Sequence, residues 1–254
     1  MILDKFKLDG KIALVTGASG GLGQAMAIAL AEAGADAACH CHFAGEAAET
    51  RAAIENLGRR TLEVSGDMAD KDVPKRLVEQ TIERFGRIDI LINNAGMIRR
   101  APAVDFSEED WATVLEVNLS SVFRLSQAAG RKMIEQGGGK IVNIASLLSF
   151  QGGVTVPAYT ASKSGVAGLT KAFANEWAKF NVNVNAIAPG YMATNNTTAL
   201  RADETRNRQI LERIPAGRWG EAEDLAGAAV FLASNASDYL QGHILTVDGG
   251  WMAR

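Results

Sequence analysis

The sequence predicts an α/β fold, in which a doubly wound sheet of seven parallel strands is covered by helices on both faces. Short apolar segments alternate with amphipathic segments of helical length from one end of the chain to the other, which is the pattern of repeated strand–helix units. No linker, internal repeat or low-complexity stretch divides the chain, and 254 residues are compatible with one large α/β domain. We therefore expect a single domain over residues 1–254.

The expected strands are short apolar runs at residues 11–16, 35–42, 61–64, 88–93, 140–145, 182–188 and 244–247. The expected helices have apolar residues at helical spacing and lie at residues 23–33, 46–57, 73–85, 108–136, 159–180 and 222–233. Gly34, Gly58 and Gly86 stand where the first three helices should end, because glycine readily adopts the left-handed conformation that closes a helix. Ser107 and Asp110 resemble a capping box at the start of the fourth helix.

Residues 191–217 interrupt this alternation. The segment is polar, contains one short stretch with helical spacing, and lies between the last two expected strands. Long connections are uncommon in compact domains and often cover a binding site. We predict that residues 191–217 form a movable lid over a ligand.

Composition and charge exclude several classes of protein. Apolar residues make up 47% of the chain and charged residues 22%, which is typical of a globular protein with a large core and not of a disordered one. A net charge of −3, without a basic cluster longer than a pair, argues against nucleic acid as a partner. The first seven residues alternate charged and apolar side chains, which fits neither a signal peptide nor a membrane span. We expect a cytoplasmic protein with no membrane partner.

Cysteine and histidine alternate at Cys39, His40, Cys41 and His42. Four such side chains in a row suggest a metal site, but the segment is expected to be a strand. Successive side chains of a strand point to opposite faces, so the four cannot converge on one ion. We predict no metal here and two buried, apolar thiols instead.

Small and polar residues follow three of the expected strands. They are the glycine-rich turn Thr16-Gly17-Ala18-Ser19-Gly20-Gly21-Leu22-Gly23, the segment Asn93-Asn94-Ala95-Gly96, and Ser146. The carboxyl ends of parallel strands share one edge of the sheet, and ligands of such folds bind there. Glycines let the N–H groups at a helix N-terminus approach a pyrophosphate, so the first turn predicts a dinucleotide. Taken alone, it is also compatible with a plain helix entry.

Tyr159 and Lys163 lie one helical turn apart on the same face of an expected helix. A cation within about 4–6 Å lowers the pKa of a phenol by roughly 1–3 units, so we expect Lys163 to bring Tyr159 toward proton exchange near neutrality. Ser146 would hold a carbonyl oxygen beside the phenol. Such a pair supports general acid–base catalysis, although this spacing also occurs by chance on helix surfaces.

With Asn118 and Pro189-Gly190, the order and spacing of these segments resemble the classical short-chain dehydrogenase/reductase family over nearly the whole chain. The resemblance implies a Rossmann fold, NAD(P)-dependent oxidoreduction at CH–OH groups, and a homotetramer formed through the helices at 108–136 and 159–180. It implies four catalytic residues: Asn118 anchors a water in a proton relay, Ser146 binds the substrate oxygen, Tyr159 is the acid/base, and Lys163 binds ribose and tunes Tyr159. The cofactor contacts that it implies are Gly17, Ser19, Gly21, Leu22, Gly23, His42, Asp67, Met68, Asn94, Ala95, Gly96, Tyr159, Lys163, Pro189, Gly190, Met192 and Thr194.

Within the family, the chain is most similar to members that act on sugar acids of uronate breakdown. That similarity covers segments 98–100, 149–153, 175–178, 188–197, 200–204, 214–220 and 247–254. A sugar acid carries one carboxylate and several hydroxyls, which arginine and amide side chains bind well. We predict a small-molecule sugar-acid substrate that contacts Arg100, Ser146, Gln151 and Tyr159, and either Arg99 or Arg100 would bind its carboxylate. Asn195 and Asn196 are further polar candidates.

The cofactor is expected to be NAD, with NADP as the alternative. An acidic residue at the end of the second strand would bind the ribose 2′-hydroxyl of NAD, and a basic one the 2′-phosphate of NADP. Residues 39–43 contain neither, and Gly20 supplies no positive charge within the glycine turn. His42 is the one side chain there that could pair with a phosphate, through a protonated imidazole.

Three other functions stay open. A dehydrogenase for gluconate or another sugar acid or polyol would keep the catalytic residues and differ around Gln151 and residues 191–217. Reduction of ketones on an acyl carrier protein would need a basic docking patch, and none is evident. A non-catalytic nucleotide-binding scaffold would usually lack Ser146, Tyr159 or Lys163, which are all present.

Overall fold

A seven-stranded parallel sheet forms the centre of the computed structural model, which describes residues 1–254. Its strands are β1 (Ile12–Val15), β2 (Asp36–Cys41), β3 (Thr61–Ser65), β4 (Ile90–Asn93), β5 (Gly139–Ile144), β6 (Val182–Pro189) and β7 (Ile244–Val247). They are hydrogen-bonded in the order β3-β2-β1-β4-β5-β6-β7, and every pair is parallel. The predicted fold class is confirmed. Strand order reverses between β1 and β4, and a crevice for a ligand forms at such a point.

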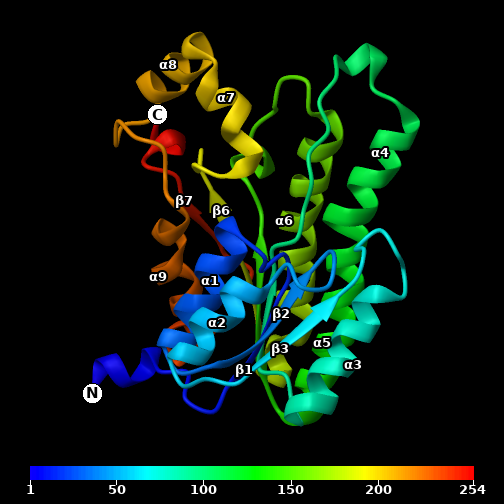
Figure 1. The fold of residues 1–254 in the computed structure, drawn as a ribbon, viewed down its shortest axis with the longest axis vertical. Coiled ribbons are helices and arrows are strands. Elements are labelled where there is room, and N and C mark those ends of the chain that lie inside the picture. Colours follow the sequence, from blue (N-terminus) through cyan, green and yellow to red (C-terminus); the bar gives the residue numbers. More distant parts are fainter.

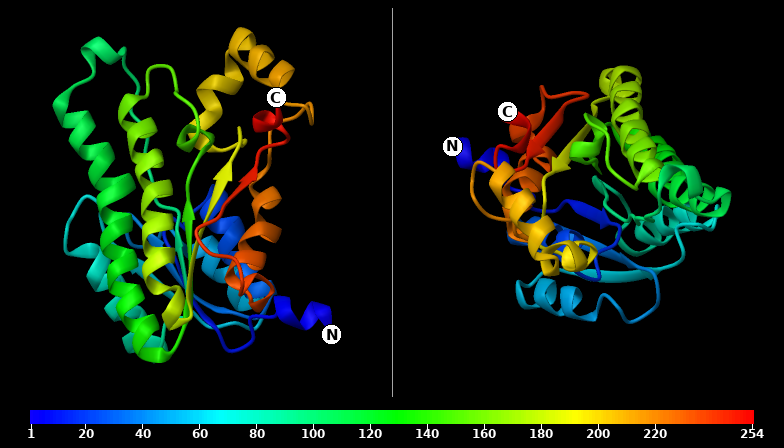
Figure 2. Two further views of the ribbon diagram at one scale, coloured as in Figure 1. Left: turned by 180° about the vertical axis from the view of Figure 1, so that it is seen from behind. Right: turned by 90° about the horizontal axis from the view of Figure 1, so that it is seen from above.

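The helices are α1 (Gly21–Glu32), α2 (Ala48–Asn56), α3 (Val73–Phe85), α4 (Glu108–Leu115), α5 (Ser121–Gln136), α6 (Pro157–Trp177), α7 (Thr198–Ala202), α8 (Glu204–Arg213) and α9 (Ala226–Ala233). One face of the sheet packs against α1, α2 and α9, and the other face against α3, α5 and α6. Figures 1 and 2 show the two helical layers on either side of the strands. Both sheet faces are therefore buried, as helical crossovers require.

The side-chain alternation of each strand divides the core between these layers. On β1, Ala13 and Val15 pack on the side of α1, and Leu14 packs on the opposite side with Leu91 of β4. Full burial of a leucine stabilises the fold by about 1.5–3 kcal/mol. A register shift by one residue would exchange the two faces, so this packing holds the carboxyl ends of the strands level with one another.

The bounds of α1, α2 and α9 differ from the prediction by one to four residues at an end, and the helices expected at 108–136 and 159–180 differ in other ways. Residues 108–136 form α4 and α5 with a π-helical turn, Glu116–Ser120, between them. The helix expected at 159–180 begins earlier, at Pro157, because proline is tolerated in a first turn, where its missing N–H would be unpaired anyway. The boundaries of α3 and β7 match the prediction.

The cysteine–histidine segment is a strand, as expected. Cys39 and Cys41 are fully buried on the α1 side of β2, and His40 points to the other face. No cluster of three or more His, Cys, Asp or Glu side chains in the protein is arranged to hold a metal ion. None of the helices has both the length and the apolar character needed to cross a bilayer.

The segment 191–217 projects beyond the carboxyl edge of the sheet, where α7 and α8 stand next to the C-terminus (Figure 1). The prediction of one short helix was incomplete, since the segment has two. Asp203 separates them: its side chain accepts a hydrogen bond from the backbone N–H of Arg206 at 3.0 Å and caps α8. Capping by aspartate stabilises a helix start by about 1 kcal/mol.

Candidate active site

The glycine turn lies between β1 and α1, at the point where strand order reverses. Gly17 and Gly21 have φ values of +65° and +54°, a conformation that costs other residues energy. Gly23 leaves no room for a side chain, because a Cβ atom there would lie 2.1 Å from the carbonyl oxygen of Gly17. These three glycines are therefore required by the local backbone.

Side chains directly after β1 and β4, and one within β2, hold the turn in place. The Thr16 hydroxyl accepts hydrogen bonds from the N–H groups of Asn94 at 2.9 Å and Ala95 at 3.0 Å, and the Asn94 amide donates to the Thr16 carbonyl at 2.8 Å. On β2, Nδ1 of His40 accepts a hydrogen bond from the N–H of Gly17 at 3.2 Å. Burial keeps the pKa of this imidazole below its usual value. Sequence reasoning missed this contact of His40. A polar residue in the middle of a buried strand was the available signal.

The N-terminus of α1 is free to receive a charged group. Its N-cap residue, Gly20, provides no side-chain cap, and its first turn contains no acidic residue. Ser19, Gly20 and Gly21 are exposed, and Thr194 stands opposite them, its Cγ2 3.8 Å from where a Cβ of Gly21 would lie. Unpaired N–H groups and the positive end of the helix dipole fit a pyrophosphate.

The remaining predicted cofactor residues are distributed along the same edge. His42 and Asp67 lie side by side in solvent, 3.9 Å apart, and Leu22 and Gly96 are at least partly accessible. Pro189 and Gly190 line the main cavity. Met68 and Met192 are 4% and 5% exposed, so only their backbone or a small part of the side chain is accessible to a ligand.

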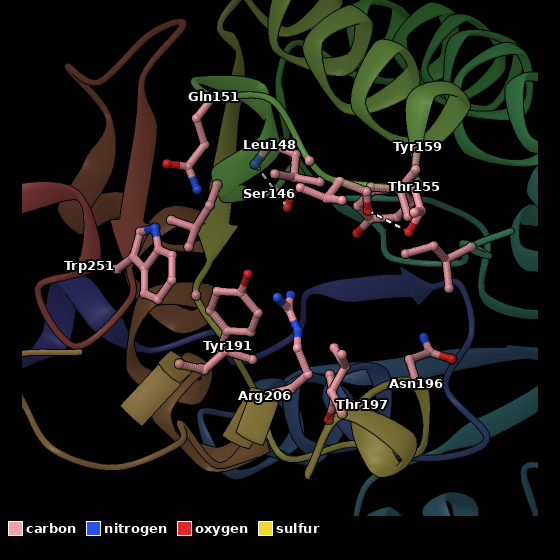
Figure 3. Close-up of a pocket in the computed structure, with 18 of the residues that line it drawn as sticks. Ser146, Leu148, Gln151, Thr155, Tyr159, Tyr191, Asn196, Thr197, Arg206 and Trp251 are labelled. Carbon is pink, nitrogen blue, oxygen red and sulfur yellow. Dashed lines mark hydrogen bonds between the residues drawn. The ribbon is translucent and has the colours of Figure 1, made fainter. Parts of the chain in front are cut away.

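Ser146, Tyr159 and Lys163 come together at the end of β5 and the start of α6. The Ser146 hydroxyl accepts the N–H of Leu148 at 3.2 Å and interacts with the Tyr159 phenol. Lys163 is buried, its Nζ lies 5.6 Å from the centre of the Tyr159 ring, and it donates to the Ile144 carbonyl at 2.6 Å. Figure 3 shows Ser146 and Tyr159 on one wall of a cavity.

The expected lowering of the Tyr159 pKa by Lys163 is wrong for this structure. Burial raises the pKa of Tyr159, and the hydrogen bond with Ser146 and the charge of Arg100 offset this only in part. Burial also lowers the pKa of Lys163 to about 8. Both shifts have the same cause, because an apolar environment disfavours the charged form of each group. The phenol is therefore a proton donor at neutral pH.

Asn118 occupies the π-helical turn between α4 and α5. Its side-chain amide is fully buried, accepts the N–H of Met97 at 2.8 Å, and donates to the Met97 carbonyl at 2.8 Å and to Ser162 at 3.3 Å. These bonds tie the turn to the loop after β4 and to α6. π-Turns occur frequently at functional sites. Because its side chain is occupied, a water at Asn118 would have to be held by the backbone.

A cavity of about 680 Å³ lies between Tyr159 and the segment 191–217. Its lining includes Arg100, Arg206 and Arg213 but no aspartate or glutamate, so the cavity is positively charged. Such an environment favours an anionic ligand. Gln151 and Asn196 line the cavity as predicted, and Figure 3 shows Arg206 pointing into its centre.

The two arginines of the sequence prediction point in different directions. Arg100 lines the cavity, whereas Arg99 pairs with Asp110 at 3.3 Å and does not line it. Arg206 and Arg213 were missed. Their spacing of seven residues on a short helix, which places both on one face, was the signal that could have identified them.

A doubly wound sheet with a glycine turn at its switch point, beside a tyrosine–lysine pair at the wall of a cavity, defines a class of dinucleotide-dependent oxidoreductases. Residues 17–252 match the family described as enoyl-(acyl carrier protein) reductase. The chain belongs to the short-chain dehydrogenase/reductase family, whose members use NAD(P) to oxidise hydroxyl groups or reduce ketones.

Several relatives are similar over their whole length. The 2-dehydro-3-deoxy-D-gluconate 5-dehydrogenases of Escherichia coli and Dickeya dadantii are 58% and 57% identical over 255 residues, with 100% of each chain covered. A crystal structure of a 2-deoxy-D-gluconate 3-dehydrogenase from Agrobacterium tumefaciens with bound NADP is 56% identical. It has a TM-score of 0.93 and covers 99% of this chain and 100% of its own.

Proposed function

We propose that this protein is an NAD(P)-dependent sugar-acid dehydrogenase that acts on 2-dehydro-3-deoxy-D-gluconate and its 5-keto form. The cavity is the main support for this proposal. It is lined by three arginines and no acidic residue, and Tyr159 forms part of its wall. Relatives that are 57–58% identical over the full length carry this activity in their names. A single-carboxylate substrate with several hydroxyls matches both the charge and the polar lining.

The cofactor would bind along the carboxyl edge, from the glycine turn to the lid. Gly17, Gly21 and Gly23 would receive the pyrophosphate, which fits the uncapped N-terminus of α1. Met68 and Asp67 would lie at the adenine, and Asn94 to Gly96, Pro189, Gly190, Met192 and Thr194 would continue toward the nicotinamide. When bound, the nicotinamide supplies or accepts the hydride.

The protein's own residues would orient the substrate and move the proton. In ketone reduction, Ser146 donates a hydrogen bond to the carbonyl oxygen, and Tyr159 donates its proton to the oxygen as negative charge develops there. General acid catalysis of this kind contributes about 10²–10⁴ in rate. Because its pKa is raised, Tyr159 holds this proton at neutral pH. Lys163 would bind ribose, and Asn118 would support a water that returns protons to the site.

Arg100 and Gln151 would contact the substrate itself. Arg100 lines the same cavity as Tyr159, and its positive charge offsets part of the rise in the pKa of Tyr159, which supports a place for Arg100 at the substrate. Both side chains line the cavity, and both donate the hydrogen bonds that hydroxyl and keto oxygens accept. Residues 191–217 would act as a lid over this cavity.

We propose NAD as the preferred cofactor and NADP as a second one. Asp67 stands 3.9 Å from His42 at the end of β2, and its carboxylate would repel a 2′-phosphate. The Agrobacterium relative was crystallised with NADP, so the preference is expected to be a ratio of affinities and not an exclusion. The ratio of kcat/KM for NADH and NADPH measures it directly.

A homotetramer in the cytoplasm remains our proposal for the assembled enzyme. Trp111 of α4 and Phe123 of α5 are 38% and 40% exposed, which favours a contact with another subunit. Val122 and Phe173, on the neighbouring helix faces, are buried within the chain and are not available for one. Analytical ultracentrifugation of the wild type and of Phe123→Glu would test the assembly.

The function is tested by initial rates with NADH and with NADPH against three ketones: 2,5-diketo-3-deoxygluconate, 5-ketogluconate and a simple acyl ketone. Turnover of the deoxy-diketo acid at the highest kcat/KM would support the proposal. Activity restricted to 5-ketogluconate would retain the catalytic residues and replace the substrate. Activity restricted to the acyl ketone would remove the sugar-acid assignment.

A further inference from the structure

Helix α8 presents two arginines to the cavity, and their guanidinium groups contact only neutral side chains: Arg206 donates to Gln209 at 3.4 Å, and Arg213 donates to Gln151 at 3.4 Å. Arg206 and Arg213 are separated by two helical turns and lie on the same face, with Gln209 between them in the lining. Neither has a carboxylate within 4.0 Å, whereas Arg208, on another face of the same helix, is 4.0 Å from Glu212. The two arginines that face the cavity therefore have no acidic partner within the protein, and an anionic ligand could provide one.

Arg213 is held in place by contacts from distant parts of the chain. Its guanidinium carbon lies 4.0 Å from the centre of the Trp251 ring, and it donates to the Gln151 amide oxygen at 3.4 Å. Its backbone carbonyl accepts the Nε–H of Arg254 at 3.2 Å. Stacking on an aromatic ring preorganises a guanidinium and leaves its edge free for hydrogen bonds.

The indole of Trp251 contributes a second, independent observation. Trp251 is 5% exposed and lines the cavity, yet its Nε1–H has no hydrogen-bond acceptor. In Figure 3 the indole nitrogen is on the side that faces Gln151, at the end of the cavity away from Tyr159. Buried donors are normally paired, so one left open at a binding site indicates an acceptor that arrives with the ligand.

The chemistry of the proposed substrate places its acid group at this end. Its carboxylate is at C1 and its reacting group at C5, so the two lie at opposite ends of the carbon chain. With C5 at Ser146 and Tyr159, a carboxylate at the other end of the carbon chain would reach the part of the cavity that α8 lines. Arg206 supplies a guanidinium in the centre of the cavity (Figure 3), and Arg213 supplies one beside Trp251.

We propose that Arg206 and Arg213 of α8, supported by Gln151 and Trp251, form the carboxylate subsite that makes this enzyme select acids over neutral polyols. The inference rests on the proposed sugar-acid activity and assigns the residues that bind the acid group. It separates the two tasks of the cavity: Ser146 and Tyr159 face the reacting carbon, and the lid helix recognises the charge. Substrate binding would thereby also draw the lid onto the cavity.

The test compares D-gluconate with D-glucitol, which differs from it only in having a CH₂OH group in place of the carboxylate. Their dissociation constants are measured by calorimetry on the enzyme saturated with NADH, where gluconate cannot be oxidised. We expect the wild type to bind gluconate more tightly than glucitol. Arg206→Ala and Arg213→Ala should each raise the dissociation constant of gluconate about tenfold or more. Glucitol binding should not change. Arg208→Ala, on the same helix but outside the cavity, is the matched control.

Arg213→Met keeps the apolar contact with Trp251 and removes the charge, so it controls for loss of packing. The proposal is overturned if the wild type binds both ligands equally, or if the α8 variants weaken the binding of glucitol as much as that of gluconate. It is also overturned if Arg100→Ala lowers the affinity for gluconate and neither α8 variant does. Failure of the proposed function looks different. The wild type would not turn over sugar acids, while selective gluconate binding would still be lost in the Arg206 and Arg213 variants.

Discussion

Replacing Lys163 with methionine should stabilise the protein at neutral pH while it removes activity. Lys163 is 4% exposed, and burial lowers the pKa of its ammonium to about 8 from an ordinary value of 10.5. The folded protein therefore bears the cost of a buried charge. Methionine has a similar length and fills the same space without that charge.

The size of the effect follows from the pKa. A pKa of about 8 in place of 10.5 corresponds to about 3 kcal/mol, at 1.36 kcal/mol for each factor of ten. The variant also loses the hydrogen bond from Nζ to the Ile144 carbonyl, which costs about 1 kcal/mol. We expect a net gain of about 2 kcal/mol in the free energy of unfolding, or about 4 °C in Tm for a chain of this length.

The gain should depend on pH in a defined direction. Below about pH 8 the lysine is charged in both the folded and the unfolded chain, and the full penalty applies. Between pH 8 and 10.5 the folded chain has lost this proton and the unfolded chain still binds it, so the stability of the wild type rises relative to the variant. The difference between the two proteins should therefore shrink as pH rises through this window.

Urea denaturation of the wild type and Lys163→Met at pH 7 and at pH 9.5 measures both effects. Groups distant from position 163 titrate alike in the two proteins, and burial raises the pKa of the neighbouring Tyr159 away from this pH window. The change in their difference therefore belongs to Lys163. A difference that is the same at both pH values, or a variant that is less stable at pH 7, would refute the reasoning. Activity should be lost at either pH.

Three further predictions concern the candidate site. Tyr159→Phe should lower kcat by about 10²–10⁴ and leave the Kd for NADH unchanged; normal turnover would remove Tyr159 from the mechanism. Gly23→Ala should weaken cofactor binding at least about tenfold in a fluorescence titration, because its Cβ would meet the Gly17 carbonyl at 2.1 Å, whereas Gly20→Ala, in open space, should not. Since burial raises the pKa of Tyr159, alcohol oxidation should accelerate as pH rises above neutrality and ketone reduction should not; matching pH–rate profiles would contradict this.

The sequence alone determined the architecture and most of the chemistry of the site. Strand–helix alternation predicted the seven-stranded sheet, and the boundaries of α3 and β7 followed from hydrophobic spacing and a terminal glycine. The glycine turn, Ser146 and the Tyr159–Lys163 pair were found because each depends on local order and spacing. Patterns of this kind depend only on residues that are close together in the sequence, so they can be recognised without the structure.

Tertiary structure decided which of these groups meet and how strongly they are buried. Arg99 and Arg100 are adjacent in sequence, but one pairs with Asp110 and the other lines the cavity. Arg213 meets Gln151 and Trp251 only because α8, a loop after β5 and the C-terminal tail converge.

The pKa values of Tyr159 and Lys163 were likewise beyond sequence reasoning. Spacing on a helix predicted the attraction between the two groups, whereas the directions of their shifts came from desolvation by the surrounding core. Desolvation depends on every atom packed around a group, and those atoms come from strands and helices far apart in the chain. The sequence therefore determined the glycine turn, Ser146 and the Tyr159–Lys163 pair. Only the folded packing added Arg206 and Arg213 to the cavity and determined the charge states and partners of these groups.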